Sequence, residues 1–269
     1  MAIYLRAEQG AYASRVLVAG DPGRISRLAG MLSAARLVTE HRGLVGYTGT
    51  YRGVDVSLQA VGMGCPSMAM IGQELIEYGV RQMVRIGTCS SFATSVRNGH
   101  LVVVTGSAAG DGTTRSLAGT SPVAAVPDFE LTSALVRAAQ QSPSALHVGP
   151  VVTVDVEPHL SATSTGDWRK QGLLAVEMES AAMFSLALRA SSASEHVRAA
   201  CILTVSDGLD GHPDGPQEYL SDGDLEVATD VMHTVALEAI VSGSLTVETS
   251  VSDRRSLKDS QSTDFEVAP

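Results

Sequence analysis

Short apolar segments rich in β-branched residues alternate along the chain with segments of helical periodicity, and this alternation constrains the fold more than any other feature. The expected strands are Val16–Ala19, Val54–Ala60, Met83–Ile86, Leu101–Thr105, His147–Val154, Leu174–Val176 and Ala199–Val205. The expected helices are Ile25–Leu32, Ser67–Tyr78, Asp128–Gln140, Glu179–Arg189 and one within Glu218–Ile240. Strand, loop and helix in repetition predict a layered α/β domain. Ligands of such domains bind at the carboxyl ends of the strands, so the residues there are the candidates for function.

The charge and the aromatic content argue against two classes of partner. The formal net charge is -10 over 269 residues, and aromatic residues make up only 4%. An acidic chain is repelled by nucleic acids and by anionic membranes, and few rings are available to stack on single-stranded bases. We therefore expect no nucleic acid and no membrane as partner, and any anionic ligand must be held by a few well-placed arginines.

The cysteines and the first residues favour a cytoplasmic protein. Cys65, Cys89 and Cys201 lie far apart and form neither a disulfide framework nor a zinc pattern, so a reducing compartment is expected. The segment that begins with Met1 lacks the basic start and apolar run of a signal peptide. No apolar run approaches the ~18 residues that a membrane helix requires.

The composition changes near the end of the sequence. Residues 1–243 are expected to form one domain. Residues 244–269 are polar and rich in serine, and they lack helical or strand periodicity, so this segment is predicted to be a disordered tail.

Two strand ends combine glycine with arginine. Gly20–Arg24 follows a buried strand, and its backbone N–H groups and Arg24 are suited to an anion such as phosphate. A plain strand-to-helix turn with a surface arginine is the alternative. Arg85 ends an apolar strand just before Gly87 and Thr88, and a buried arginine needs a partner. A bound oxyanion and a structural carboxylate are equally compatible with that pattern.

Two further strand ends carry acids. Glu177 and Glu179 flank Met178 where a strand becomes a helix, and paired acids there can hold sugar hydroxyls or share protons. Ordinary acidic residues at a helix start would have the same pattern. Asp207 ends a buried strand, where a carboxylate can serve as a proton donor or simply as a turn residue.

The sequence lacks the motifs of several common binding sites and catalytic sites. Gly62 and Gly64 are not followed by the third glycine of a dinucleotide fingerprint, and neither a phosphate-loop motif nor a serine nucleophile elbow is present. The histidines lack the spacing of metal ligands. We therefore expect neither a metal nor an organic cofactor.

The motifs, in this order, resemble those of one family. The matching residues are Gly20–Arg24, His41–Gly43, Tyr47–Tyr51, Gly62–Ser67, Arg85–Cys89, Pro127–Phe129, Glu177–Glu179 and Thr204–Asp207. From about Ile3 to Ile240 the chain resembles the hexameric purine nucleoside phosphorylases, which are grouped with uridine and methylthioadenosine phosphorylases and with nucleosidases. The resemblance implies a three-layer α/β/α fold with a central mixed β-sheet. It also implies phosphorolysis of a nucleoside to free base and pentose 1-phosphate, and a homo-oligomer assembled as a trimer of dimers.

The resemblance assigns roles residue by residue. Phosphate, the co-substrate, would be held by Gly20, Arg24, Arg85 and Thr88, together with Arg42 from a neighbouring subunit. Asp207 would protonate or hydrogen-bond the leaving purine, and Glu179 would accept hydrogen bonds from the ribose hydroxyls. The residues expected to bind the nucleoside are Tyr4, Cys89, Glu157, Glu177, Met178, Glu179 and Ser206.

The chain differs from the family at residues expected to contact the sugar and the base of the nucleoside. Tyr4 stands where the family usually has a histidine, and the segment Thr153–His159 lacks the usual aromatic residue over the base, with Glu157 near its place. Phe92 is a candidate for a substitute aromatic face. No arginine follows Asp207 before Ile240, although some members have one there to assist protonation. An altered substrate preference is expected.

Other functions are also compatible with the sequence. A uridine phosphorylase is disfavoured because Asp207 is present and the Gln-x-Arg pair for uracil is absent. Nothing in the sequence excludes a methylthioadenosine phosphorylase. A hydrolytic nucleosidase would not need Arg24, Arg42 and Arg85. The alternative from a different class is a nucleoside-binding protein that has lost catalysis.

Overall fold

The computed structural model describes residues 2–122, 124–157, 165–191, 195–209 and 217–242. The tail predicted at 244–269 lies outside these residues, as do Pro158 and His159. No helix among the described residues is both long and apolar enough to cross a membrane.

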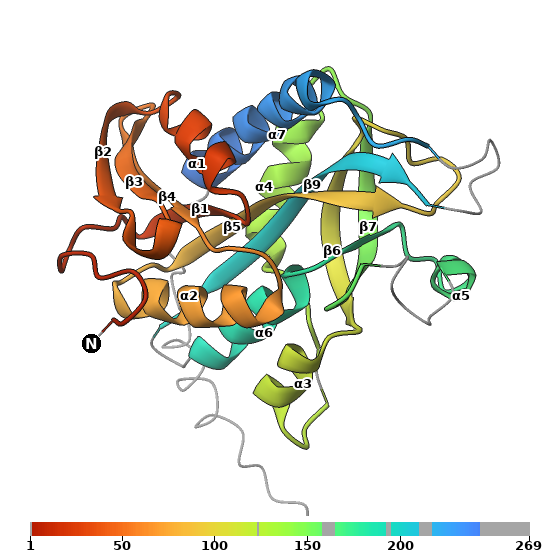
Figure 1. Cartoon of the computed structure of the whole chain (residues 1–269), viewed down its shortest axis with the longest axis horizontal. Coiled ribbons are helices and arrows are strands. Elements are labelled where there is room, and N and C mark those ends of the chain that lie inside the picture. Colours follow the sequence, from red (N-terminus) through yellow and green to blue (C-terminus); the bar gives the residue numbers. More distant parts are fainter. Residues whose placement is uncertain (1, 123, 158–164, 192–194, 210–216, 243–269) are drawn as a thin grey trace, which may run out of the picture.

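Nine strands of the described residues form one mixed sheet (Figure 1). They are β1 (Arg15–Ala19), β2 (Ser33–Thr39), β3 (Gly46–Tyr51), β4 (Val54–Ala60), β5 (Gln82–Ser91), β6 (Leu101–Ala109), β7 (Leu146–Thr153), β8 (Ala175–Glu177) and β9 (Arg198–Gly208). Their order is β2-β3-β4-β1-β5-β8-β7-β6-β9, and β9 also pairs with β5. The half of the sheet from β5 to β9 therefore closes on itself, whereas the β2–β3–β4 half stays open.

Helices cover both faces of the sheet, which confirms the expected three-layer α/β/α fold. They are α1 (Pro22–Ala29), η1 (His41–Gly43), α2 (Cys65–Glu77), α3 (Gly112–Ala118), α4 (Phe129–Ala139), α5 (Thr165–Lys170), α6 (Ser180–Ala190) and α7 (Asp222–Ser242). Helices α1, α4 and α7 pack on one face through apolar residues such as Leu28, Leu135 and Leu237. Helices α2 and α6 pack on the other face through residues that include Leu75 and Phe184.

The expected strands and helices are all present, and several elements are found that the pattern did not predict. The antiparallel strands β2 and β3 form one edge of the sheet. Strand β2 is mostly exposed, so it lacks the alternation of apolar and polar residues that marks a half-buried strand. The short α3 and α5 consist mainly of polar residues and glycine, which carry no helical signal of their own.

Strands β5 and β9 are longer than predicted, and this changes the setting of two motifs. Strand β5 continues to Ser91 and β9 continues to Gly208, because the two pair in parallel along almost their whole length. Thr88 and Cys89 are therefore strand residues and do not follow a turn after Arg85. Asp207 likewise lies inside β9, one residue before its end.

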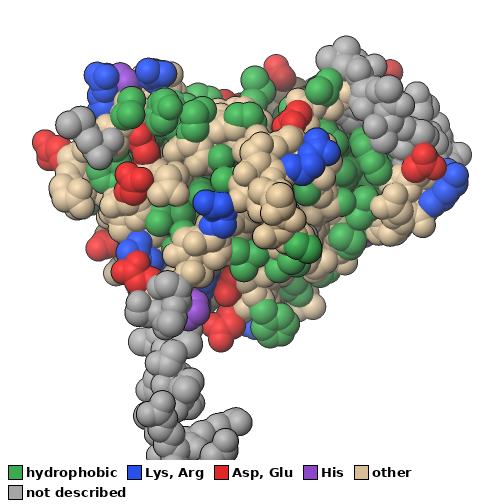
Figure 2. All heavy atoms as spheres, turned by 90° about the horizontal axis from the view of Figure 1, so that it is seen from below, with side chains coloured by type: hydrophobic (Ala, Val, Ile, Leu, Met, Phe, Trp, Pro, Cys, Tyr) green, Lys and Arg blue, Asp and Glu red, His purple; other side chains and the backbone are tan. Residues whose placement is uncertain are grey.

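The molecular surface shows no extended basic region on the face that Figure 2 presents. Acidic, basic and apolar side chains are interspersed there. This distribution is consistent with the net charge of -10.

Candidate active site

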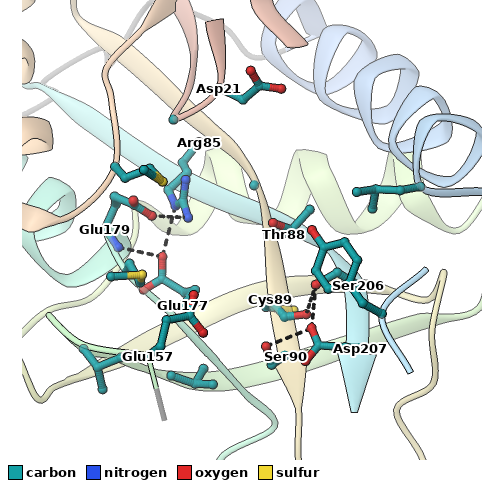
Figure 3. A pocket seen from close by; sticks show the side chains of 18 of the residues that line it. Asp21, Arg85, Thr88, Cys89, Ser90, Glu157, Glu177, Glu179, Ser206 and Asp207 are labelled. Atoms are coloured by element: carbon teal, nitrogen blue, oxygen red, sulfur yellow. Dashed lines mark hydrogen bonds and ion pairs between the residues drawn. The ribbon is translucent and has the colours of Figure 1, made fainter. Parts of the chain in front are cut away.

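One pocket, of about 420 Å³, collects the carboxyl ends of β1, β5 and β9 and the junction of β8 with α6 (Figure 3). Every residue predicted to bind phosphate or nucleoside lines this pocket except Tyr4 and Arg42. Residues to which the sequence assigned no binding role also line it: Asp21, Met63, Gly87, Ser90, Val154, Val176, Tyr219 and Leu225. The site therefore lies where the fold class places ligands.

Arg24 supplies a buried positive charge at one end of the pocket. It is 9% exposed, on the first turn of α1, where Asp21 caps the helix by accepting hydrogen bonds from the backbone N–H groups of Gly23 and Arg24. No carboxylate lies within ion-pair distance of Arg24 among the described residues, and its Nη1 donates only to the carbonyl of Ile86 at 3.4 Å. Burial, followed by the charge of Arg85, lowers the pKa of Arg24. This guanidinium is suited to an anionic ligand.

Arg85 is a second buried positive charge, and two carboxylates of the protein pair with it. Its Nε lies 3.0 Å from Glu177 Oε2, and its Nη2 forms an ion pair with Glu179 Oε2. Burial would lower the pKa of Arg85, but Glu179 and Glu177 together raise it above the ordinary value. Of the two partners considered for this arginine, a structural carboxylate is therefore present. Nη1 makes no hydrogen bond with any described residue, and Arg85 still lines the pocket.

Gly87 permits this arrangement of Arg85. A Cβ atom at Gly87 would lie 2.8 Å from the Arg85 guanidinium, closer than real Cβ contacts come. The glycine after the arginine is thus required by packing, because the guanidinium folds over the backbone of its own strand.

Glu177 is occupied by protein donors on both oxygens. Oε2 accepts hydrogen bonds from the backbone N–H groups of Glu179 and Ser180, each at 2.9 Å, in addition to its contact with Arg85. Oε1 accepts from the Ser180 hydroxyl at 2.7 Å and from the Thr153 hydroxyl. This carboxylate therefore ties Arg85 to the start of α6.

Glu179 faces the pocket with a carboxylate that is only partly engaged. Oε1 accepts a hydrogen bond from the Gly64 N–H at 2.6 Å, and Oε2 pairs with Arg85. Burial raises the pKa of Glu179, and the charge of Arg85 opposes that shift. Each oxygen keeps a lone pair that can accept a hydrogen bond from a ligand hydroxyl.

Asp207 lies at the other end, and a β-bulge directs it into the pocket. The register of β5 and β9 shifts between Cys89 and Ser90, so that Ser206 is the extra residue and Ser90 pairs with Asp207. Consecutive residues of a regular strand face opposite ways, but here Ser206 and Asp207 both line the pocket. Asp207 Oδ1 lies 2.9 Å from Ser90 Oγ and 2.7 Å from Ser206 Oγ, while Oδ2 accepts no hydrogen bond from a described residue.

Cys89 and Glu157, two further residues predicted to bind the nucleoside, also line the pocket. The Cys89 thiol is buried, and burial raises its pKa far above the ordinary value, so it is present as a neutral group. Glu157 is exposed where it lines the pocket. Phe92, the candidate for a substitute aromatic face, is 1% exposed and packs on Trp168, with ring centroids 5.9 Å apart. That expectation was wrong, because Phe92 fills the core beneath β7 and β8 and does not reach the pocket.

Tyr4 and Arg42 lie together outside the pocket. The Arg42 guanidinium is 5.4 Å from the centre of the Tyr4 ring. Glu74 of α2 holds this segment by accepting hydrogen bonds from the backbone N–H groups of Tyr4 and Leu5, at 2.9 and 2.8 Å, and from that of Ile3. Burial alone would raise the pKa of Glu74, but these bonds lower it below the ordinary value. An acid on the apolar face of a predicted helix was the signal that could have identified this anchor.

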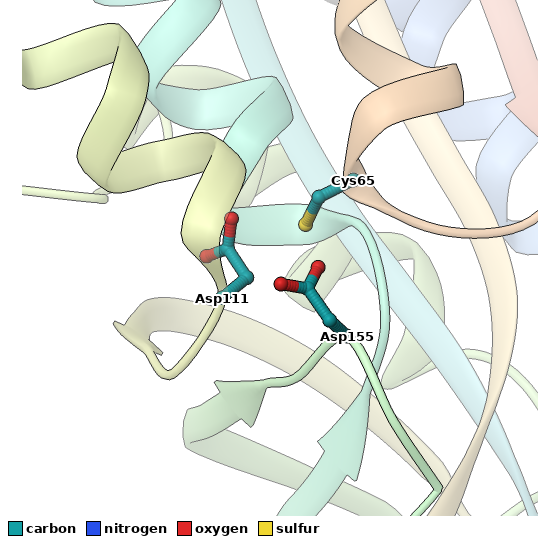
Figure 4. Close-up of side chains that lie close together, drawn as sticks. All are labelled: Cys65, Asp111 and Asp155. Carbon is teal, nitrogen blue, oxygen red and sulfur yellow. The ribbon is translucent and has the colours of Figure 1, made fainter.

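One cluster of possible metal ligands occurs among the described residues, formed by Cys65, Asp111 and Asp155 (Figure 4). The two carboxylates hold the start of α3: Asp111 accepts from the Thr114 N–H at 2.6 Å and Asp155 from the Gly112 N–H at 2.7 Å. Burial, with the charges of Asp111 and Glu177, raises the pKa of Cys65 far above its ordinary value. These capping hydrogen bonds account for the positions of the two carboxylates beside Cys65.

Comparisons with known proteins agree with the motif analysis. Residues 14–241 match the family model described as the phosphorylase superfamily. A guanosine phosphorylase of Halorubrum lacusprofundi is 35% identical over 77% of this chain and 83% of its own length. Purine nucleoside phosphorylases of the DeoD type from Myxococcus xanthus and Haemophilus ducreyi are 36% and 33% identical, over 86% and 91% of this chain and 96% and 100% of their own lengths.

Proposed function

The chain belongs to the phosphorylase superfamily, and from this premise we propose that it cleaves the N-glycosidic bond of purine nucleosides with inorganic phosphate. The products are the free base and pentose 1-phosphate, so the enzyme is a pentosyltransferase. The names of its relatives, purine nucleoside phosphorylase and guanosine phosphorylase, support this reaction. The observation that carries the proposal is one pocket with a buried arginine that pairs with no described carboxylate at one end and Asp207 at the other.

Phosphate acts as nucleophile and as counter-charge. Arg24 binds the dianion with the backbone N–H of Gly20, the Thr88 hydroxyl and the Nη1 donors of Arg85. A phosphate oxygen attacks the anomeric carbon as the bond to the base breaks. The transition state resembles an oxocarbenium ion, so the negative charge held beneath the sugar stabilises it more than it stabilises the substrate.

Glu179 binds the sugar hydroxyls. As positive charge grows on the sugar ring, those hydroxyls become more acidic and their hydrogen bonds to a carboxylate strengthen. Arg85 keeps this carboxylate in place, and Glu177 keeps Arg85 in place. Met178, which also lines the pocket, provides an apolar surface for the sugar.

Asp207 completes the reaction at the base. The electron pair of the broken bond moves onto the purine, and a proton from the carboxyl group of Asp207 neutralises it. Ser90 and Ser206 hold Oδ1, which leaves Oδ2 to carry the proton toward the base. Solvent returns the proton after the base has left.

The remaining assignments concern the assembly and its setting. Tyr4 and Arg42 serve the pocket of a neighbouring subunit in a dimer-based homo-oligomer, which accounts for their lying outside the pocket of their own chain. Cys65, Cys89 and Cys201 are free thiols, which supports the cytoplasm as the compartment.

Phosphate is the only co-substrate and no metal takes part, so we expect dialysis against a chelator to leave the turnover unchanged. A loss of turnover that zinc restores would contradict this.

The test is the release of free base from adenosine, inosine, guanosine, uridine and methylthioadenosine, each with and without phosphate. Release from purine nucleosides that requires phosphate is the expected result. Release without phosphate would make the enzyme a hydrolase. Release from uridine alone would overturn the purine assignment, and binding without any release would leave a nucleoside-binding protein.

A further inference from the structure

We propose that Tyr219 forms the aromatic wall of the base-binding end of the pocket and determines the preference for purines. The inference deepens the proposed function and rests on it. Residues Thr153–Val156 and Glu157 carry no aromatic ring and cannot stack on the base. The proposal assigns this stacking contact to Tyr219, which lies just before α7.

The backbone on both sides of Tyr219 is fixed against the strand that carries Asp207. Gln217 pairs with Gly208 through two hydrogen bonds of 3.1 Å, and the Leu220 N–H donates to the Ser206 carbonyl at 2.9 Å. These contacts fall on either side of Asp207 along β9. Tyr219 lies between Gln217 and Leu220, so it is held next to Asp207 and not on a free loop.

The sequence offers few other rings for this role. Among the described residues that line the pocket, Tyr219 is the only one with an aromatic side chain. Phe92 is buried against Trp168. The segments 158–164 and 210–216, which lie outside the described residues, contain no Phe, Tyr or Trp.

The Tyr219 side chain is exposed and accessible to a ligand. It is 59% exposed, although it lines a pocket, and no hydrogen bond of its hydroxyl is found within the described part of the chain. Leu225, Val154 and Met178 line the same pocket and add apolar surface to it. A flat base that enters this space covers the ring and removes apolar surface from water.

The expected effect follows from the energy of stacking. A base stacked on an aromatic side chain is stabilised by about 1–3 kcal/mol. At about 1.36 kcal/mol for each factor of ten, loss of the ring should weaken purine nucleoside binding by about 5- to 150-fold. The two-ring purine overlaps the tyrosine over a larger area than the one-ring pyrimidine, so discrimination against uridine should shrink in the same variant.

Arg24 lines the same pocket as Tyr219, so the Tyr219 hydroxyl has a competing role near the phosphate. The variants Tyr219→Phe and Tyr219→Ala separate the two roles, because phenylalanine keeps the ring and loses the hydroxyl. If the ring is what matters, Tyr219→Phe retains the wild-type KM for inosine and guanosine, and Tyr219→Ala raises it 5- to 150-fold. The KM for phosphate stays within about twofold in both.

Two outcomes overturn the proposal. One is a nucleoside KM of Tyr219→Ala equal to that of the wild type. The other is a rise in the phosphate KM that Tyr219→Phe and Tyr219→Ala share. Val227→Ala is the matched control, because Val227 lies on α7, which closely follows Tyr219, is 69% exposed and does not line the pocket. Thermal unfolding of all three variants checks that they fold.

Failure of the proposed function gives a distinguishable result. If the wild type releases no base in the presence of phosphate, the reaction is wrong. Calorimetric titration of wild type and Tyr219→Ala with guanosine and uridine then tests the ring alone. Weaker guanosine binding by Tyr219→Ala supports the aromatic wall, and equal binding contradicts it.

Discussion

Arg24 and Arg85 line the same pocket in opposite electrostatic environments. Arg85 is neutralised by Glu177 and Glu179, whereas Arg24 has no acid within ion-pair distance among the described residues. A buried charge without a partner costs free energy that a bound anion recovers. Arg24 is therefore the residue through which phosphate should stabilise the fold.

The variant Arg24→Met tests this assignment, because methionine keeps much of the length and loses the charge. We expect the phosphate KM to rise about 10- to 150-fold, the equivalent of ~1.5–3 kcal/mol for hydrogen bonds to a charged group. We expect the unfolding temperature without phosphate to be equal to or above that of the wild type, and the rise that phosphate causes to vanish. Arg27→Met is the control, since Arg27 lies on the same helix and pairs with Glu226 and Asp230 at the surface. A normal phosphate response of Arg24→Met would refute the role.

Asp207 should matter for the departure of the base and little for binding. Asn in its place can still hydrogen-bond the purine but has no proton to give, so Asp207→Asn should lower kcat by about 10²–10⁴-fold and leave the phosphate KM unchanged. A purine methylated at N7 leaves without protonation, so cleavage of 7-methylguanosine should be nearly normal in this variant. Ser90→Ala, which removes one donor to Oδ1, should have a smaller effect. An equal loss with both substrates would show that Asp207 does not act as the acid.

At the scale of single residues, the sequence predicted those that lie in short glycine-rich or acidic motifs. Gly20, Arg24, Thr88, Glu179 and Asp207 all line the pocket as expected. Tyr219 was missed because its position depends on pairing with a strand that precedes it, and no local pattern encodes such a contact. The two ion pairs of Arg85 could not be predicted for the same reason. The sequence shows that a buried arginine needs a partner, but it does not show which partner lies within reach.

At the scale of elements, the strands and helices with buried faces were predictable and the exposed ones were not. Strand β1 and helix α2 carry clear periodic patterns because they bury one face or both. Strand β2 is held by its pairing with β3, and such pairing depends on tertiary context more than on residue type. The bulge at Ser206 is also a tertiary feature, and it decides which way Asp207 faces.

Helix α7 contains a titratable group that should make the stability of the fold depend on pH. His233 is fully buried, and burial, followed by the charges of Arg24 and Arg27, lowers its pKa from 6.5 to about 4, while Asp230 acts in the opposite direction. Between these values the unfolded chain binds a proton that the folded chain does not. The free energy of unfolding should therefore fall by about 3 kcal/mol as the pH drops from 6.5 to 4, and His233 should contribute no further change below that.

The measurement is denaturant unfolding of wild type and His233→Leu at pH 7.5, 5.5 and 4. The difference between the two proteins isolates the histidine and its interaction with Asp230, because the titratable groups far from His233 behave equally in both. We expect the wild type to lose stability relative to the variant as the pH falls. A difference that stays constant over this range would show that His233 is not held neutral.

At the scale of the whole molecule, the position of Tyr4 and Arg42 predicts that the pocket is completed by another subunit. Both are anchored outside the pocket of their own chain, with Glu74 fixing the backbone of Tyr4 and the Tyr4 ring lying against Arg42. If Arg42 binds phosphate, it must do so in a neighbour, and each pocket of a dimer then depends on both chains.

Subunit mixing tests this dependence. Arg42→Ala should bind phosphate poorly and Asp207→Asn should turn over slowly, so each alone should be nearly inactive. In a mixed dimer, the pocket of the Arg42→Ala subunit keeps its own Asp207 and receives an intact Arg42 from the Asp207→Asn subunit. Random exchange should thus restore about a quarter of the wild-type sites. If Arg42 instead served its own chain, every pocket would lack one of the two groups and the mixture would be as inactive as its components. Restored turnover that appears only after subunit exchange would therefore place Arg42 in the neighbouring site.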